Sequence, residues 1–91
     1  MNPEASKHIK EIQKSKWAWY KKSTICKLAM MRHEIFREME EAEEYCKLSI
    51  HYEYLNPAPF MKEINGLKRH LKTIQKKKIK GGKPANVGCS L

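Results

Sequence analysis

The chain has 91 residues and a formal net charge of +9, from 19 Lys and Arg against 10 acidic residues. A chain of this length forms one small domain with a thin core, and its positive charge favours acidic partners. No apolar stretch is long enough for a signal peptide or a membrane span, so we expect an intracellular protein of the cytoplasm or cytoskeleton, with the nucleus as the alternative.

A helix is predicted to begin near residue 3. Asn2 can cap it, Pro3 fits the first turn, and Glu4 lies near the positive end of the helix dipole. Residues 4–55 contain no Gly or Pro and are rich in helix-favouring residues, which predicts one long helix over residues 3–55. A kink is possible near residues 22–25, where a Ser or Thr side chain could cap a second helix.

Apolar residues in the middle of the chain recur mostly in steps of three, four or seven, which predicts a seam along one helix face. They are Ile25, Leu28, Ile35, Met39, Ala42 and Cys46. We interpret this seam as a packing face against another helix. Residues 48–54 leave an alternative open, because apolar and polar side chains alternate there as in a strand, which a partner's sheet would have to complete.

The clearest boundary is Asn56-Pro57-Ala58-Pro59, because a residue before proline is pushed out of helical geometry. A second helix is predicted over residues 58–80, followed by two glycines and a flexible basic tail over residues 81–91. The expected fold is all-α, with residues 1–80 as a single helical unit. The second helix either folds back on the first as a hairpin or extends away from it.

Charge is distributed unevenly along the chain. Residues 1–28 and 57–91 are basic, whereas residues 29–56 carry seven acidic and three basic side chains. In a hairpin, the acidic run over residues 38–44 would lie near Lys62, Lys68, Arg69 and Lys72 and form weak exposed ion pairs with them.

Three features predict partner binding. Two Trp and one Tyr within four residues cannot all point to one helix face, so at least one ring is exposed and can anchor in a partner or stack on bases. The second helix carries an apolar seam with coiled-coil spacing, and its last turns hold a lysine run that can grip phosphates. The predicted binding residues are Trp17, Trp19, Tyr20, Lys21, Lys22, Phe60, Ile64, Leu67, Leu71, Ile74, Lys76, Lys77, Lys78 and Lys80.

Two of these features, the aromatic cluster and the lysine run, also have a purely structural interpretation. In it, Trp17 and Tyr20 cover the end of the hairpin while Trp19 lies on the surface. The lysine run is then a solvated helix end that keeps the protein soluble.

Catalytic chemistry has no support in the sequence. There is no glycine-rich phosphate loop, nucleophile elbow or Cys-x-x-Cys motif, and the three Cys and four His have no metal-ligand spacing. We therefore expect no enzyme activity, no catalytic residue, no cofactor, no metal ion and no small-molecule substrate, and the patterns resemble no particular family.

The sequence favours a non-catalytic structural or adaptor subunit that docks on a large acidic assembly or on a partner helix. The assembly that we expect is cytoskeletal, the lattice of a microtubule or cilium. The first alternative is a nucleic-acid-binding nuclear or ribonucleoprotein component. A weaker alternative is a calmodulin-type target, because residues 60–80 form a basic amphipathic helix. Binding to a membrane is not expected.

Overall fold

The computed structural model describes residues 1–81, and they are all-helical with no strand among them. The four helices are α1 (Pro3–Lys14), α2 (Trp19–Ile35), α3 (Met39–Tyr54) and α4 (Met61–Gly81). The all-α prediction is confirmed. The predicted flexible tail lies, from residue 82 onward, outside the described residues.

The start of α1 follows the sequence prediction. The Asn2 side chain accepts a hydrogen bond of 2.7 Å from the Glu4 backbone N–H, and Pro3 occupies the first turn. The Asn2 backbone N–H donates to a Glu41 carboxylate oxygen on α3 at 2.7 Å. The cap therefore also ties the N-terminus to the rest of the fold.

The single helix predicted over residues 3–55 is wrong, because three helices occupy this range and no kink occurs at residues 22–25. The first break follows Lys14, where the Ser15 hydroxyl donates to the Ile12 carbonyl at 2.8 Å and the backbone becomes extended at Ser15 and Ala18. The helix propensity of these residues favours one continuous helix. A short helix, however, is stabilised mainly by tertiary burial, and the break lets α1 fold back and pack on the other helices.

The second break is a left-handed turn at Arg37, whose φ is 59°. The Glu38 N–H donates to the His33 carbonyl at 2.8 Å, and the Arg37 N–H donates to the Glu34 carbonyl at 3.0 Å. These two bonds form the Schellman pattern that ends many helices, in which glycine usually takes the left-handed position. Because arginine occupies that position in place of glycine, the end of α2 could not be predicted from the sequence.

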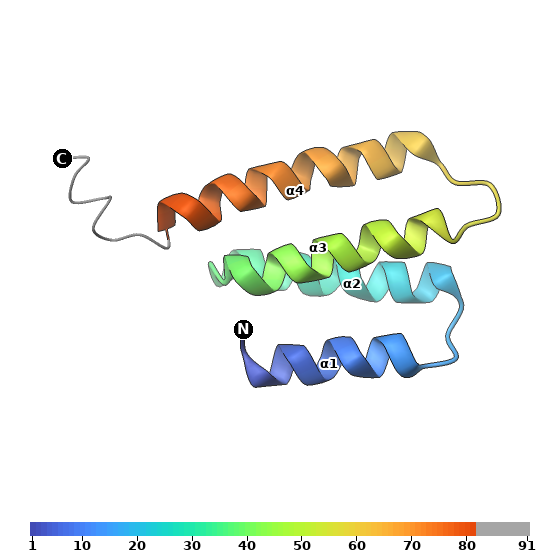
Figure 1. Cartoon of the computed structure of the whole chain (residues 1–91), viewed down its shortest axis with the longest axis horizontal. Coiled ribbons are helices and arrows are strands. Elements are labelled where there is room, and N and C mark those ends of the chain that lie inside the picture. The colour runs from blue at the N-terminus through green and yellow to red at the C-terminus, as the bar shows by residue number, and fades with distance from the viewer. Residues whose placement is uncertain (82–91) are drawn as a thin grey trace.

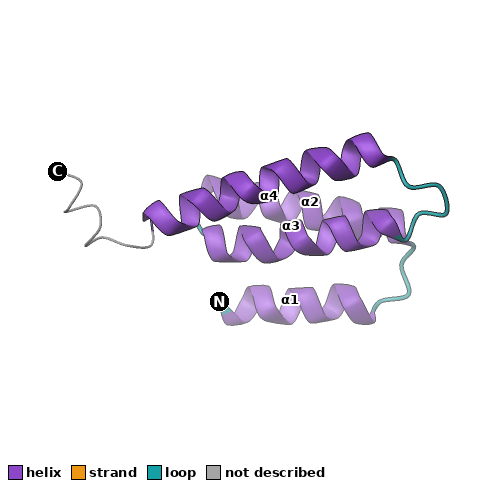
Figure 2. Ribbon diagram, turned by 45° about the horizontal axis from the view of Figure 1, so that its top comes forward, coloured by secondary structure: helices purple, strands orange, loops and turns teal. Residues whose placement is uncertain are grey.

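α2 and α3 form an antiparallel pair, with α1 and α4 on opposite sides of it (Figures 1 and 2). The side chains between the paired helices are small, which permits a close approach of the two backbones. Those with almost no exposed surface are Ser23, Cys26, Ala42, Cys46 and Ser49. Larger side chains complete a thin core from all four helices, and these are Ile12, Met30, Tyr45, Tyr52, Ile64, Leu67 and Ile74.

The predicted middle seam is correct only in part. Ala42 and Cys46 are fully buried, but Leu28 is 61% exposed and Ile35 is 76% exposed. The turn at Arg37 resets the helical phase, so residues before it and after it do not share one face. The strand alternative for residues 48–54 is also wrong, since they belong to α3.

The predicted hairpin between the second helix and the chain before it is confirmed, with α4 packed on α3. Ile64 and Ile74 have no exposed surface, and the Cys46 thiol lies 3.5 Å from the Leu67 carbonyl oxygen. Phe60 departs from the predicted seam because it precedes α4 and is exposed. The α1–α2 connection and the α3–α4 connection lie at the same end of the molecule (Figure 1).

Candidate binding surface

The connection between α1 and α2 lies at the same end of the molecule as the connection between α3 and α4 (Figures 1 and 2). The Ser23 hydroxyl of α2 donates to a Glu53 carboxylate oxygen of α3 at 2.5 Å, which fixes the beginning of α2 beside the end of α3. Side chains from both connections therefore gather on one surface.

The predicted aromatic cluster supplies the first part of this surface. Trp17 and Tyr20 are exposed, whereas Trp19 is half-buried and packs edge-to-face on Tyr20 with a centroid distance of 5.6 Å. The expectation of at least one exposed ring is confirmed. The purely structural interpretation is wrong for these rings, since it placed Trp19 on the surface and Trp17 and Tyr20 over the end of the hairpin.

The two predicted lysines beside the cluster differ in their contacts. Lys21 is exposed, and its Nζ lies 4.6 Å from the Trp17 ring centroid, a cation–π distance. Lys22 Nζ lies 5.3 Å from the Tyr52 ring centroid and donates to the Gln13 carbonyl at 3.4 Å. Lys21 is thus available to a partner, while Lys22 helps to hold α1, α2 and α3 together.

The α3–α4 connection adds residues that the sequence prediction did not place here. Tyr54, Leu55, Phe60 and Met61 are all exposed. Lys68 Nζ donates to the Tyr54 hydroxyl at 2.6 Å and lies 5.1 Å from its ring centroid, so this side also pairs a ring with a cation. We call the whole set the aromatic end, and its members are Trp17, Tyr20, Tyr54, Leu55, Phe60 and Met61.

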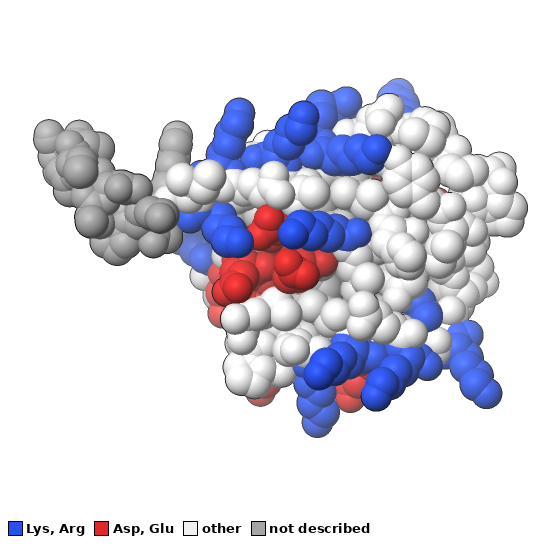
Figure 3. Space-filling view, in the orientation of Figure 1, with Lys and Arg blue, Asp and Glu red and all other residues white. Residues whose placement is uncertain are grey.

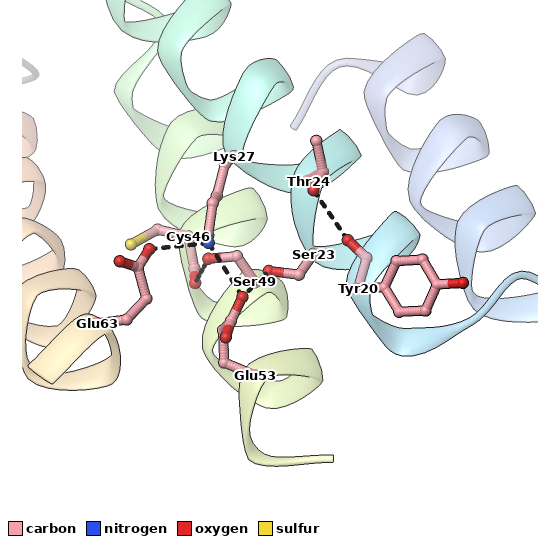
Figure 4. A network of polar contacts seen from close by, with 8 residues as sticks. All are labelled: Tyr20, Ser23, Thr24, Lys27, Cys46, Ser49, Glu53 and Glu63. Carbon is pink, nitrogen blue, oxygen red and sulfur yellow. Dashed lines mark hydrogen bonds and ion pairs between the residues drawn. The ribbon is translucent and has the colours of Figure 1, made fainter. Parts of the chain in front are cut away.

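A buried polar network lies next to the aromatic end (Figure 4). Lys27 Nζ of α2 contacts a carboxylate oxygen of Glu53 at 3.0 Å and one of Glu63 on α4 at 2.8 Å. Burial alone would raise the pKa of Glu53, but hydrogen bonds from Ser23 and Lys27 outweigh it and hold that pKa below its ordinary value. The Lys27 amino group therefore joins α2 to both α3 and α4, and its partner Glu53 stays ionised at neutral pH.

The outward face of α4 carries a second charged feature, a line of cations that we call the basic row. It consists of Lys62, Arg69, Lys72 and Lys76, which are all exposed and fall within an arc of about 80° on a helix of 100° per residue. The buried residues of α4 occupy the opposite side. The basic row extends roughly 21 Å along the helix axis, from the aromatic end toward the other end of the molecule.

The acidic run over residues 38–44 forms ion pairs with different groups from those predicted. A carboxylate oxygen of Glu43 accepts from Lys78 at 2.8 Å, and Glu40 lies 3.3 Å from the amino group of Met1. Within residues 1–81, no ion pair joins this run to the expected Lys62, Lys68, Arg69 or Lys72. In Figure 3 the acidic side chains gather between cations over α4 and cations over α1. The basic row consequently keeps its charge for solvent or a partner.

The remaining predicted binding residues fall into two groups. Ile64, Leu67 and Ile74 are buried and Leu71 is half-buried, so the chain itself occupies the apolar seam of α4. Lys76 and Lys77 are exposed, Lys78 is paired with Glu43, and the side chain of Lys80 lies outside the described set.

A polar cleft of about 560 Å³ lies at the other end of the molecule, between α1, the end of α2 and the start of α3. His8 Nδ1 is hydrogen-bonded to the Tyr45 hydroxyl at 2.6 Å, and the His33 ring stacks on Tyr45 with a centroid distance of 5.3 Å. His33 Nδ1 in turn lies 2.6 Å from a Glu38 oxygen. Burial raises the pKa of Tyr45 to about 12. These contacts fasten α1 to the α2–α3 pair.

The buried thiols and the carboxylates show no arrangement for metal binding in the described chain, since residues 1–81 hold no group of three or more suitable side chains. Burial raises the pKa of Cys26 to about 12 and that of Cys46 to about 11, so both thiols stay protonated at neutral pH.

Comparison of the chain with protein-family models, with curated proteins and with solved structures found no match. None of the helices in residues 1–81 combines the length and the apolar character that crossing a membrane requires.

Proposed function

We propose that the protein is a non-catalytic adaptor that docks on an acidic protein assembly through the aromatic end and the basic row of α4. The observation that carries this proposal is the adjacency of the two features. Exposed rings at Trp17, Tyr20 and Phe60 can anchor in apolar pockets, and the cations of the basic row, which begins beside them, can meet acidic side chains.

The state of the buried carboxylates supports a binding role over a catalytic one. Hydrogen bonds from Lys78 and Gln75 hold the pKa of Glu43 below its ordinary value, although burial opposes them. Glu53 has a lowered pKa for similar reasons. A general acid at neutral pH needs a raised pKa, so these two groups suit ion pairs that hold helices together.

A microtubule is the acidic assembly that we propose to test first, by co-sedimentation at increasing salt. The test variant is R69Q/K72Q/K76Q on α4, and the matched control is K7Q/K10Q/K14Q on α1. The two triplets have the same spacing and consist of exposed residues, and each set of substitutions removes three positive charges from the net +9. α4 and α1 lie on opposite sides of the α2–α3 pair (Figure 1).

The α4 variant should bind roughly tenfold more weakly, from about 0.5 kcal/mol for each lost charge pair, while the α1 variant stays close to wild type. The variant W17S/Y20S should also weaken binding, with less dependence on salt than the α4 variant shows. Equal losses from both lysine triplets would mean that net charge alone attracts the chain, and the proposed docking surface would then be wrong.

Nucleic-acid binding is the second candidate, because the basic row presents four cations along one helix face, as a phosphate backbone requires. If four phosphates are contacted, the logarithm of the association constant for a short DNA duplex should fall against the logarithm of salt concentration with a slope of roughly −3 to −4. A steeper salt dependence with DNA than with microtubules, and tighter binding to DNA, would favour this candidate. The calmodulin-type alternative is not proposed, because the apolar face of α4 is buried in the chain's own core.

A further inference from the structure

α2 has two apolar faces, and within residues 1–81 only one of them packs against other helices. The buried face is formed by Ser23, Cys26 and Met30, which fall within an arc of about 60°. On the opposite side, Thr24, Leu28, Met31 and Ile35 occupy another arc of about 60°, and all four are exposed. We call these four residues the outer face of α2.

The outer face lacks the character of a solvated helix surface. Leu28, Met31 and Ile35 lie at positions i, i+3 and i+7, which is the anchor spacing by which one helix packs on another. Phe36 follows directly and is also exposed. A contiguous exposed strip of this kind marks an interaction site more often than scattered surface residues do.

The charges beside the outer face indicate what would cover it. Lys21 and Arg32 lie along one border, and both are exposed. Along the other border, Lys27 is held by Glu53 and Glu63, and Glu34 lies 2.8 Å from His70 Nε2. The free charge next to the apolar strip is therefore positive.

This charge distribution favours a different chain over a second copy. Two copies packed through their outer faces would bring Lys21 and Arg32 of both chains into the same interface, where like charges oppose association. A helix whose apolar strip is bordered by Asp or Glu would instead place a carboxylate near each cation.

We propose that the outer face of α2 binds an amphipathic helix of a partner protein whose apolar strip is bordered by acidic residues. The strip from Thr24 to Ile35 is roughly 16 Å long, which corresponds to about three turns of the partner helix. This site is independent of the basic row on α4, and it would give an adaptor its second surface.

A synthetic helical peptide provides the test. The probe is a labelled peptide of roughly 18 residues with Leu in a heptad strip and Glu on both borders, and the matched probe carries Lys in place of Glu. Fluorescence anisotropy with the full chain should give a dissociation constant on the order of 10–100 μM for the Glu peptide, and binding at least tenfold weaker for the Lys peptide.

Two matched variants locate the site. L28S should weaken binding of the Glu peptide by about tenfold, whereas I79S should leave it within about twofold, since Ile79 of α4 lies outside the proposed interface. Leu28 and Ile79 are each 61% exposed, so both variants should keep the helix content of wild type in circular dichroism. R32E leaves one positive and one negative charge on that border and should reduce the preference for the Glu peptide over the Lys peptide to less than about threefold.

Three results would overturn the proposal. The first is no binding of the Glu peptide by a chain with native helix content, and the second is equal loss of binding from L28S and I79S. The third is a dimer in sedimentation equilibrium that L28S dissociates, which would assign the outer face to a second copy. None of these results depends on the α4 variants that test the proposed function.

Discussion

α2 and α3 are neighbours in an antiparallel pair, and each buries one face against the other helices. Their outward faces have opposite chemistry. The outward positions of α3 are mostly polar or charged and are Glu40, Glu44, Lys47, His51 and Tyr54, whereas those of α2 are Thr24, Leu28, Met31 and Ile35. α3 packs on both α2 and α4 and buries eight residues, whereas α2 packs mainly on α3 and buries three, so the apolar residues on the outside of α2 are not needed for its packing in the described chain.

This difference in outward chemistry distinguishes residues that stabilise the fold from residues that are available to bind a partner. The α3 face satisfies its charges locally, with Lys47 Nζ at 3.6 Å from oxygens of both Glu43 and Glu44. The three large apolar residues of the α2 face cannot form ion pairs, and each has more than half of its surface exposed in the described chain. Substitutions on the two sides of one helix should therefore have very different effects on stability.

The largest expected difference is between two adjacent methionines of α2. Met30 is 5% exposed and belongs to the core, whereas Met31 is 53% exposed on the outer face. M30A should lower the free energy of unfolding by about 2–4 kcal/mol because it leaves a cavity, and M31A should change it by less than about 0.5 kcal/mol. Urea unfolding followed by circular dichroism measures both, and equal losses would show that the outer face contributes to the fold.

A second pair of substitutions compares the buried and outward faces of α3. E53A removes a carboxylate that accepts from Ser23 and Lys27, and it should cost about 1–3 kcal/mol because the buried Ser23 hydroxyl loses its acceptor and Lys27 keeps only Glu63 as a partner. E40Q removes a carboxylate on the outward face, which pairs only with the amino terminus in the described chain, and it should cost less than about 0.5 kcal/mol. Thermal unfolding of the two variants should rank them in this order, and the reverse ranking would contradict the role assigned to the network in Figure 4.

Acid should weaken the same network. A carboxyl group with a lower pKa in the folded chain than in the unfolded chain stabilises the fold above its unfolded pKa, near 4.5 for Glu53. That contribution is lost as the pH falls through the folded value. The groups that face the Glu53 carboxylate are Ser23 and Lys27 of α2, and Lys27 also contacts Glu63 of α4. Wild type should therefore lose more stability than E53Q between about pH 6 and pH 3 in urea unfolding, and parallel curves would contradict the assignment.

The smallest expected effect concerns the turn between the two compared helices. Arg37 has a φ of 59°, which is strained for a residue with a side chain. R37G should raise the free energy of unfolding by about 0.5–1 kcal/mol, because relief of the strain exceeds the added entropy of the unfolded chain. A lower melting temperature for this variant would show that the Arg37 side chain itself stabilises the turn.

The parts of the fold that could be predicted from sequence are those with local causes. Asn2 and Pro3 mark the start of α1 by capping, and the two prolines at positions 57 and 59 mark the break before α4. The breaks after Lys14 and Ile35 carry no such signal, because one depends on tertiary burial and the other places Arg37 where glycine is usual.

The candidate surfaces were predictable to a similar extent. Exposure of at least one ring in the aromatic cluster could be predicted, since neighbouring rings cannot share one helix face, but the sequence did not tell that Trp17 and Tyr20 are the exposed ones. The gathering of Tyr54 and Phe60 at the same end required the antiparallel arrangement of α2 and α3. The outer face of α2 could not be predicted, because apolar residues occur on both sides of that helix and periodicity alone does not tell which side is buried.

The most direct test of the contrast between α2 and α3 is a heteronuclear NMR titration of the labelled full chain with the Glu-bordered helical peptide. Amide shift changes confined to residues 21–36 of α2, with the outward positions 40–51 of α3 unchanged, are the result that our account predicts. Changes concentrated on α3, or spread evenly over every basic surface of the molecule, would contradict it.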